Sequence, residues 1–286
     1  NNLKIRARSV LSTKDFLNKA GLIAAISVSV KTIISGNNLK KSEIMGVGLG
    51  FPGLIDSKKG IVHFLPNIPG WKEVNLKRIL EYKIGLPVFL DNDAKLMALA
   101  EYKKGAARGS LNALCLTLGT GVGGGLIING EIFRGFTNAT GEIGHLPINE
   151  DGPKCNCGGK ACLEAYIGNN AILKEAKNKF HKRVSLEELS YLANNGDKKA
   201  RDIWQKVGQR LGIALSAVVN LFNPDCIVIG GGVANSGKIL FQEVKKTILK
   251  RAMNVQARHV KVLPTVLGSD AGLIGAAILV KEGVKA

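Results

Sequence analysis

The sequence predicts a two-domain α/β protein with a zinc-stabilised loop. A chain of 286 residues can form one large or two ordinary domains, and we expect two. Short apolar runs with strand character alternate along the chain with longer segments of helical periodicity. One Gly-rich stretch, residues 142–164, gathers several potential metal ligands.

The net charge of the chain limits the kinds of function to consider. Forty Lys and Arg residues against 22 Asp and Glu give a formal net charge of +18, which raises nucleic acid as a partner. The basic residues are scattered over predicted helices, without helix-turn-helix spacing or aromatic interleaving. A generic basic surface, or attraction of anionic nucleotides, is therefore favoured over DNA binding.

The remaining composition is typical of a soluble globular protein, with 45% hydrophobic and 22% charged residues. No apolar run of membrane-spanning length is expected, and neither a signal nor a transit peptide is apparent. Cys115 and Cys226 lie in apolar, strand-like runs. We expect them to be buried, reduced thiols, which suits a cytoplasmic protein.

The stretch 142–164 predicts a structural zinc site. Its candidate ligands are His145, Cys155, Cys157 and Cys162. One imidazole and three thiolates suit tetrahedral Zn²⁺, and Gly158 and Gly159 permit the tight turn that brings the sulfurs together. Unrelated free thiols and disulfides are the alternatives. A bridge between Cys155 and Cys157 would be strained and gives the histidine no part.

Strands are predicted where short apolar runs end at turn residues, and helices where apolar residues recur with helical spacing after a cap. The expected strands are residues 3–10, 44–51, 87–90, 126–128, 131–133, 226–229 and 261–267. The expected helices are residues 14–34, 94–103, 163–180, 186–194, 200–222, 237–251 and 269–280. Ser12 or Thr13 would cap the first helix, and Ser269-Asp270 the last. A rigid turn is expected at 50–56 and a Pro-fixed loop at 64–71.

A candidate catalytic position follows the strand at 87–90. The carboxylates of Asp91 and Asp93 lie between the end of that strand and the start of a helix, where sites in open α/β sheets usually lie. The alternative is that Asp93 is only a helix cap.

Two glycine-rich turns are candidates for phosphate binding. Gly119, Gly121 and Gly124 fit the G-x-G-x-x-G pattern. A dinucleotide-binding fingerprint must open a helix, however, and the following residues predict strand, tight turn and strand. A Gly-rich hairpin can instead offer backbone N–H groups to phosphate. The second turn, residues 230–232, lies between a strand and a helix; a purely structural turn is the alternative.

Three motifs accompany the predicted zinc site: Glu142-Ile143-Gly144-His145, Cys155-Asn156-Cys157-Gly158 and Cys162-Leu163-Glu164-Ala165. They resemble the signature of the ROK family (repressors, open reading frames, kinases), whose enzymes are ATP-dependent sugar kinases, bacterial glucokinases among them. The resemblance implies an actin-like ATPase, or ribonuclease H-like, fold. Its domains would be residues 1–105 and 106–268, with a C-terminal helix, 269–286, completing the first.

The resemblance also assigns roles to residues. Asn92-Asp93-Ala94 matches the family motif in which the Asp is the catalytic base, although Lys95 stands where relatives often carry Asn. The hexose would be bound by Asn67, Asn92, Asp93, Glu142, His145 and Glu164. ATP, with Mg²⁺, would contact Gly119, Thr120, Gly121, Gly123, Gly124, Gly230, Gly231 and Gly232. Because the sugar contacts come from both domains, closure is expected on binding.

The favoured function is therefore ATP-dependent phosphorylation of a hexose, glucokinase-like and at the 6-hydroxyl, in a cytoplasmic homo-oligomer, expected to be a dimer. Two alternatives stay open. One is a sugar-sensing ROK regulator without its DNA-binding domain. The other, a zinc-stabilised nucleic-acid-binding protein, rests on charge alone.

One family feature has no match in these residues. Relatives begin with a hairpin whose Asp-x-Gly-Gly-Thr turn grips phosphate and Mg²⁺, whereas residues 1–10 resemble their third strand. We expect the gene to encode roughly 20 to 30 further residues before Asn1, enough for two strands and a turn. A protein made from Asn1 is expected to bind sugar weakly and not to turn over ATP.

Overall fold

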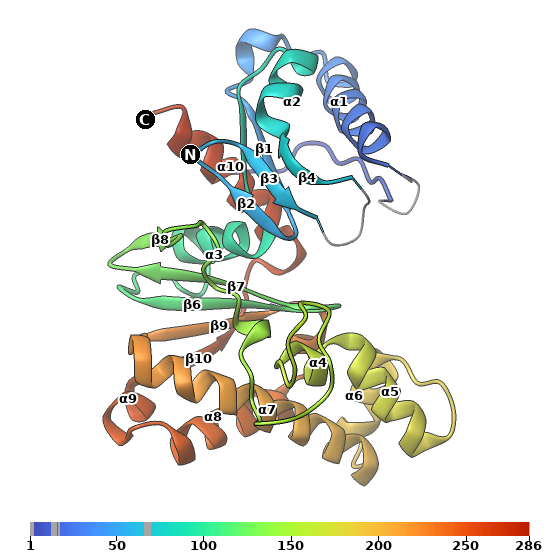
Figure 1. Cartoon of the computed structure of the whole chain (residues 1–286), viewed down its shortest axis with the longest axis vertical. Helices are drawn as coiled ribbons and strands as arrows, with labels where there is room; N and C mark the ends of the chain where they lie inside the picture. Colours follow the sequence, from blue (N-terminus) through green and yellow to red (C-terminus); the bar gives the residue numbers. More distant parts are fainter. Residues whose placement is uncertain (1–2, 13–15, 17, 66–69, 286) are drawn as a thin grey trace. The chain divides into compact units, whose positions relative to one another are not determined.

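The structure, a computed structural model, describes residues 3–12, 16, 18–65 and 70–285 and divides the chain into two compact units (Figure 1). The first unit comprises Asn1–Leu96, Arg134–Ala139 and Asp270–Ala286, and the second comprises Met97–Phe133 and Thr140–Ser269. Both units combine strands and helices, so the predicted α/β class is confirmed.

The first unit contains two small sheets and the helices that pack on them. Strands β1 (Val47–Phe51) and β5 (Val88–Asn92) are parallel, whereas β2 (Leu54–Asp56), β3 (Ile61–Phe64) and β4 (Lys72–Asn75) form an antiparallel sheet. The helices are α1 (Lys19–Gly36), α2 (Leu76–Ile84), the first turn of α3 (Asp93–Lys104) and α10 (Ala271–Gly283). Apolar side chains of α1, α2, β1 and β5 share one core.

Close backbone contacts fix helix α10 in the first unit. A Cβ atom on Gly48 of β1 would lie 2.3 Å from the Ala276 carbonyl oxygen, and one on Gly275 would lie 1.9 Å from that of Leu96. Glycine is therefore required at both positions, because any side chain would push α10 away from β1 or from the start of α3.

The second unit is a five-stranded sheet with helices on it. Its strand order is β10-β9-β6-β7-β8, and β6 is parallel to β9 and antiparallel to β7. The strands are β6 (Ala113–Leu118), β7 (Val122–Ile128), β8 (Glu131–Phe133), β9 (Cys226–Gly230) and β10 (Lys261–Pro264). The helices that follow are α4 (Glu164–Ile167), α5 (Asn169–Phe180), α6 (Leu186–Asn194), α7 (Lys198–Phe222), α8 (Lys238–Arg251) and α9 (Asn254–His259). Figure 1 shows α7 and α8 side by side beneath this sheet, and their apolar faces fill its core.

Several sequence expectations for the second unit are confirmed. The hairpin of β7 and β8 turns at Asn129-Gly130, both at positive φ (51° and 80°), as this dipeptide predicts. Helix α7 ends at Phe222 and is followed by Asn223 in the left-handed conformation, directly before Pro224. Cys115 and Cys226 are buried and free, and burial raises the pKa of the Cys115 thiol well above its usual value.

Some expectations for the first unit are wrong. Residues 3–12 form no strand, because no neighbouring strand hydrogen-bonds to them among the described residues. Helix α1 begins at Lys19 and is capped by Asn18, whose side chain accepts from the Gly21 N–H at 2.9 Å. Thr13 and Lys14 lie outside the described residues. Strand β1 is shorter than expected, and the β2–β4 sheet and helix α2 were not predicted.

Helix α1 also corrects the expectation of no membrane-spanning segment. Among the described residues, it alone is long and apolar enough to cross a membrane by length and composition, with 17% of its span buried. A core helix or a signal sequence passes the same test. Leu22 and Ile23 are buried in the core that α1 shares with α2, as in a helix that packs on its own domain.

The contact between α10 and α3 yields a stability prediction. Gly275→Ala should lower the free energy of unfolding by about 1–3 kcal/mol, because the new methyl group meets a backbone carbonyl that must move. Gly272→Ala is the matched control, since nothing lies within 4 Å of its added Cβ; it should stabilise by up to about 1 kcal/mol. Urea denaturation measures both. Equal effects of the two substitutions would contradict the packing.

Candidate functional site

The junction between β5 and α3 leaves the Asp93 carboxylate available. Asn92, not Asp93, caps the helix: its Oδ1 accepts from the N–H groups of Ala94 (3.0 Å) and Lys95 (3.2 Å), and its Nδ2 donates to the Gly53 carbonyl at 3.1 Å. Asp93 is the first residue of α3, is exposed, and accepts a hydrogen bond from the Ala94 N–H at 2.8 Å. The structure therefore disfavours the alternative in which Asp93 serves only as a cap.

The environment of Asp93 suits a base. Surrounding protein partly desolvates its carboxyl group and raises the pKa of Asp93, while the Ala94 N–H opposes this shift. Lys95, two residues on, is 3% exposed and donates from Nζ to the Asn138 carbonyl. Its side chain thus contacts residues 134–139, a role that the sequence did not reveal.

In the second unit, the two glycine-rich turns lie side by side. Because β6 and β9 are parallel, with Thr117 opposite Gly230, their C-terminal ends meet at the same edge of the sheet. Gly231 has φ +89°, and a Cβ there would lie 2.2 Å from the Leu118 carbonyl oxygen, directly before Gly119. The geometry thus brings together two predicted nucleotide turns that are more than 100 residues apart.

The first of these turns consists of Gly119, Thr120 and Gly121. The Gly119 N–H donates to the Gly121 carbonyl at 2.9 Å. Within the described part of the chain, no acceptor is paired with the N–H groups of Thr120 and Gly121, so both can serve an anion. Gly123 and Gly124 lie in β7 instead, opposite Thr117 and Leu116 of β6.

Glu164 is tied to the same turn. Its Oε2 accepts from the Val122 N–H at 2.8 Å, and a Cβ on Gly121 would lie 2.4 Å from that oxygen. The Asn169 N–H donates to the Gly119 carbonyl at 2.9 Å, so the start of α5 also holds the turn. The sequence predicted Glu164 only as a sugar ligand; its support of the glycine turn depends on a contact 42 residues away in the chain.

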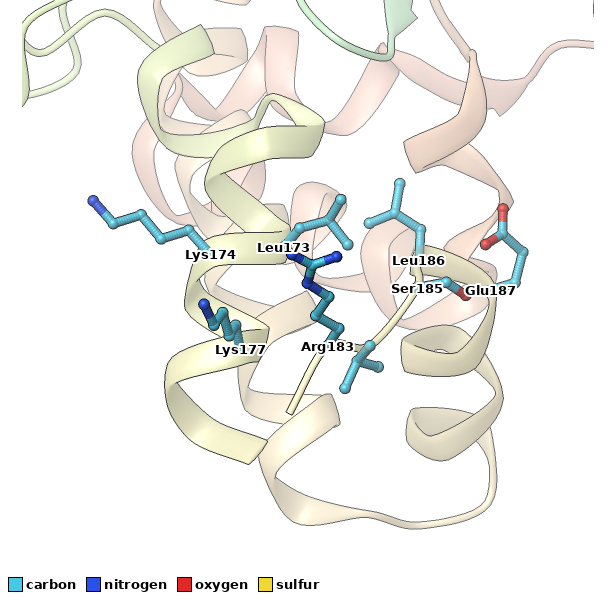
Figure 2. Close-up of a pocket in the computed structure, with 8 residues that line it drawn as sticks. Leu173, Lys174, Lys177, Arg183, Ser185, Leu186 and Glu187 are labelled. Carbon is cyan, nitrogen blue, oxygen red and sulfur yellow. The ribbon is translucent and has the colours of Figure 1, made fainter. Parts of the chain in front are cut away.

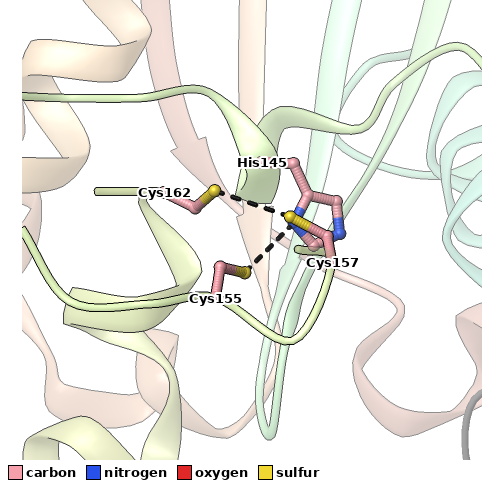
Figure 3. A group of neighbouring side chains, drawn as sticks. All are labelled: His145, Cys155, Cys157 and Cys162. Carbon is pink, nitrogen blue, oxygen red and sulfur yellow. Dashed lines mark hydrogen bonds between the residues drawn. The ribbon is translucent and has the colours of Figure 1, made fainter. Parts of the chain in front are cut away.

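The predicted zinc ligands converge (Figure 3). The ligand atoms of His145, Cys155, Cys157 and Cys162 all lie within 4.8 Å of one another. His145 Nδ1 is 3.6 Å from Cys155 Sγ, and the sulfurs of Cys157 and Cys162 are 3.7 Å apart. A tetrahedron with Zn–S bonds of about 2.3 Å has edges of about 3.8 Å, so the donor set fits zinc.

The loop is folded as its glycines require. Gly158 has φ +94° and donates to the Cys155 carbonyl at 3.0 Å, and the Cys155 N–H donates to the Gly159 carbonyl at 2.8 Å. Desolvation and the neighbouring thiols raise the pKa of Cys162 to about 12, whereas the Gly159 N–H lowers that of Cys157. A metal would bind the deprotonated form of both.

His145 presents its two ring nitrogens to different groups. Nδ1 faces the cysteines, while Nε2 lies 3.9 Å from Oε2 of Glu142. Asn67, the remaining predicted sugar ligand, lies outside the described residues. Asn92 and Asp93 belong to the first unit, whereas Glu142, His145 and Glu164 belong to the second.

A cavity of about 660 Å³ lies at the end of α5 and the start of α6 in the second unit, and none of the residues described above lines it (Figure 2). Leu173 and Leu186 line it with the basic side chains Lys174, Lys177 and Arg183. None of its lining residues was predicted from the sequence as a site residue. It contains no carboxylate pair or metal cluster among the described residues.

Comparison with known proteins agrees with this arrangement. A glucokinase from Thermotoga maritima is 35% identical over 95% of this chain and 90% of its own length. A ROK family glucokinase from Streptomyces griseus, solved with glucose and AMPPNP, has a TM-score of 0.81 at 32% identity, covering 93% of this chain and 89% of its own. A xylose repressor from Bacillus spizizenii is 34% identical over 84% of this chain and 62% of its own length.

The family model described as "ROK family" matches residues 6–283. This match spans both units, the Asn92-Asp93 junction, the glycine turns and the Cys/His cluster. The chain belongs to the ROK family.

Proposed function

We propose that this protein is an ATP-dependent sugar kinase that phosphorylates a hexose, glucose being the first candidate. The relatives named glucokinases support this activity. The single observation that carries the proposal is the capping of α3 by Asn92, which leaves the Asp93 carboxylate exposed at the end of a parallel strand. Because Asn92 already caps the helix, the Asp93 carboxylate is not needed for capping.

Asp93 is the proposed general base. A sugar hydroxyl is a weak nucleophile at neutral pH, so a carboxylate must accept its proton as the bond to phosphorus forms. The raised pKa of Asp93 makes it a stronger base than an ordinary Asp. The proposed acceptor is the 6-hydroxyl, as expected for a glucokinase-like enzyme.

The glycine turns are the proposed nucleotide site. The N–H groups of Thr120 and Gly121 would bind phosphate oxygens, and Gly231 and Gly232 would lie against the nucleoside. Gly232 has nothing within 4 Å of an added Cβ, so its surface is open. ATP would enter with Mg²⁺, which neutralises phosphate charge in such reactions.

Glu142, His145 and Glu164 are the proposed sugar ligands of the second unit, and Asn92 that of the first. Glu164 keeps Oε1 for this role, since its Oε2 is used by Val122. Zinc held by His145 and the three cysteines would fix the loop that carries His145, and would leave Nε2 to face Glu142 and the substrate.

The base assignment predicts a specific defect. Asp93→Asn in the full-length protein should reduce kcat at least about a hundredfold, because the proton acceptor is lost, while the Kd for the sugar stays nearly unchanged. A coupled assay of ADP formation with a panel of hexoses measures turnover, and calorimetry measures binding.

Unchanged turnover in Asp93→Asn would refute the role of this residue. A wild-type protein that binds sugar but forms no ADP with any hexose would instead favour the sugar-sensing regulator, in line with the repressor relatives.

The metal assignment predicts about one zinc per chain in protein purified without chelator. Cys157→Ser should lose that zinc and expose residues 145–162 to proteolysis, because a ligand is missing. Cys226→Ser, which alters a cysteine outside the cluster, is the matched control and should retain zinc. Elemental analysis measures the zinc content of both variants. Full zinc occupancy in Cys157→Ser would show that the ligand set is wrong.

A further inference from the structure

A buried carboxylate precedes the proposed base and is not part of the proposed chemistry. Asp91, at the end of β5, is 1% exposed. Its Oδ2 accepts from two nitrogens of Arg134, from Nε at 3.0 Å and from Nη2 at 2.7 Å. The Arg134 side chain is itself only 24% exposed. A pair this well shielded from solvent fixes its two partners far more firmly than a surface ion pair does.

Asp91 passes this constraint to the next residues. Its second oxygen, Oδ1, accepts from the Asn92 N–H at 2.9 Å, which sets the orientation of the peptide that leads into Asn92. Asn92 in turn caps α3 through the N–H groups of Ala94 and Lys95. A continuous set of hydrogen bonds therefore runs from the Arg134 guanidinium to the first turn of α3, where Asp93 lies.

The other end of the same segment is tied down as well. Residues 134–139 leave the β7–β8 hairpin of the second unit, belong to the first unit, and return to the second at Thr140. At the end of the segment, the Asn138 carbonyl accepts from the buried Lys95 Nζ. Each segment thus contributes one side chain to the other: Arg134 bonds to Asp91, and Lys95 bonds to the Asn138 carbonyl. In the sequence, Asp91 and Lys95 lie on either side of Asp93.

We propose that Arg134 is a positioning residue for the reaction: together with Lys95 it fastens residues 134–139 to residues 91–95 and so holds the Asp93 carboxylate in the orientation needed to take the sugar proton. This inference rests on the proposed function of Asp93. The long side chain of Lys95 suits this role, because its Nζ reaches a carbonyl of residues 134–139. A displacement of about 1 Å at a reacting group can cost on the order of a hundredfold in rate.

The test separates positioning from stability. Arg134→Gln should reduce kcat at least about tenfold with less than about a threefold change in the sugar KM, since the base is misplaced while the proposed sugar ligands of the second unit, Glu142, His145 and Glu164, are unaffected. The double variant Asp91→Asn/Arg134→Gln removes the uncompensated buried charge, so its Tm should recover toward the wild type while kcat stays low.

Arg8→Gln is the matched control. Arg8 also pairs with an aspartate of the first unit, Asp270, at 2.7 Å, and among the described residues it has no hydrogen bond or ion pair to residues 91–95. It should keep wild-type kcat. A double variant with restored Tm and wild-type kcat, or an Arg134→Gln variant with unchanged kcat, would overturn the positioning role.

Amide hydrogen exchange gives a readout that does not need turnover. In the full-length protein, peptides covering residues 91–95 should exchange at least about tenfold faster in Arg134→Gln than in Arg8→Gln, because the cap of α3 loses its support. Equal exchange in the two variants would overturn the proposal even in an active enzyme. If residues 91–95 exchange faster in Arg134→Gln but the wild-type protein forms no ADP, the fastening of residues 134–139 to residues 91–95 is supported and the proposed kinase activity is refuted.

Discussion

The hydrogen bonds that Asn92 donates and accepts are the constraint on which the account of this protein depends. They give α3 a cap that is not Asp93, and they join the helix to the turn at Gly53. The carboxylate beside the cap thereby stays exposed at the C-terminal end of a parallel strand. The buried pair of Asp91 and Arg134 supports this arrangement, because Asp91 also accepts from the Asn92 N–H.

In the second unit, the proposed nucleotide site depends on two backbone N–H groups, those of Thr120 and Gly121, for which the described residues provide no acceptor. Parallel pairing of β6 and β9 aligns the two glycine turns, and Gly231 lets their backbones touch. Glu164 and Asn169 secure the first turn from the α4–α5 side. Cys162 lies two residues before Glu164, so a metal in the Cys/His cluster would stiffen the same region.

Local chemistry made parts of this site predictable from the sequence. The spacing of Cys155, Cys157 and Cys162 with two glycines anticipates the cluster, and Asn129-Gly130 anticipates a hairpin, because each depends on neighbours in the chain. Contacts between distant segments leave no such pattern. Arg134 meets Asp91 across 43 residues, and residues 3–10 alternate like a strand yet have no partner strand among the described residues.

The most direct test of the central claim is a crystal structure of the full-length protein with glucose and a non-hydrolysable ATP analogue. The distance that matters joins an Asp93 carboxylate oxygen to the hydroxyl facing the terminal phosphate. We expect this distance to be within hydrogen-bond reach, about 2.6–3.2 Å, with the phosphates against the N–H groups of Thr120 and Gly121. A sugar bound with a different carboxylate at its reacting hydroxyl would contradict it.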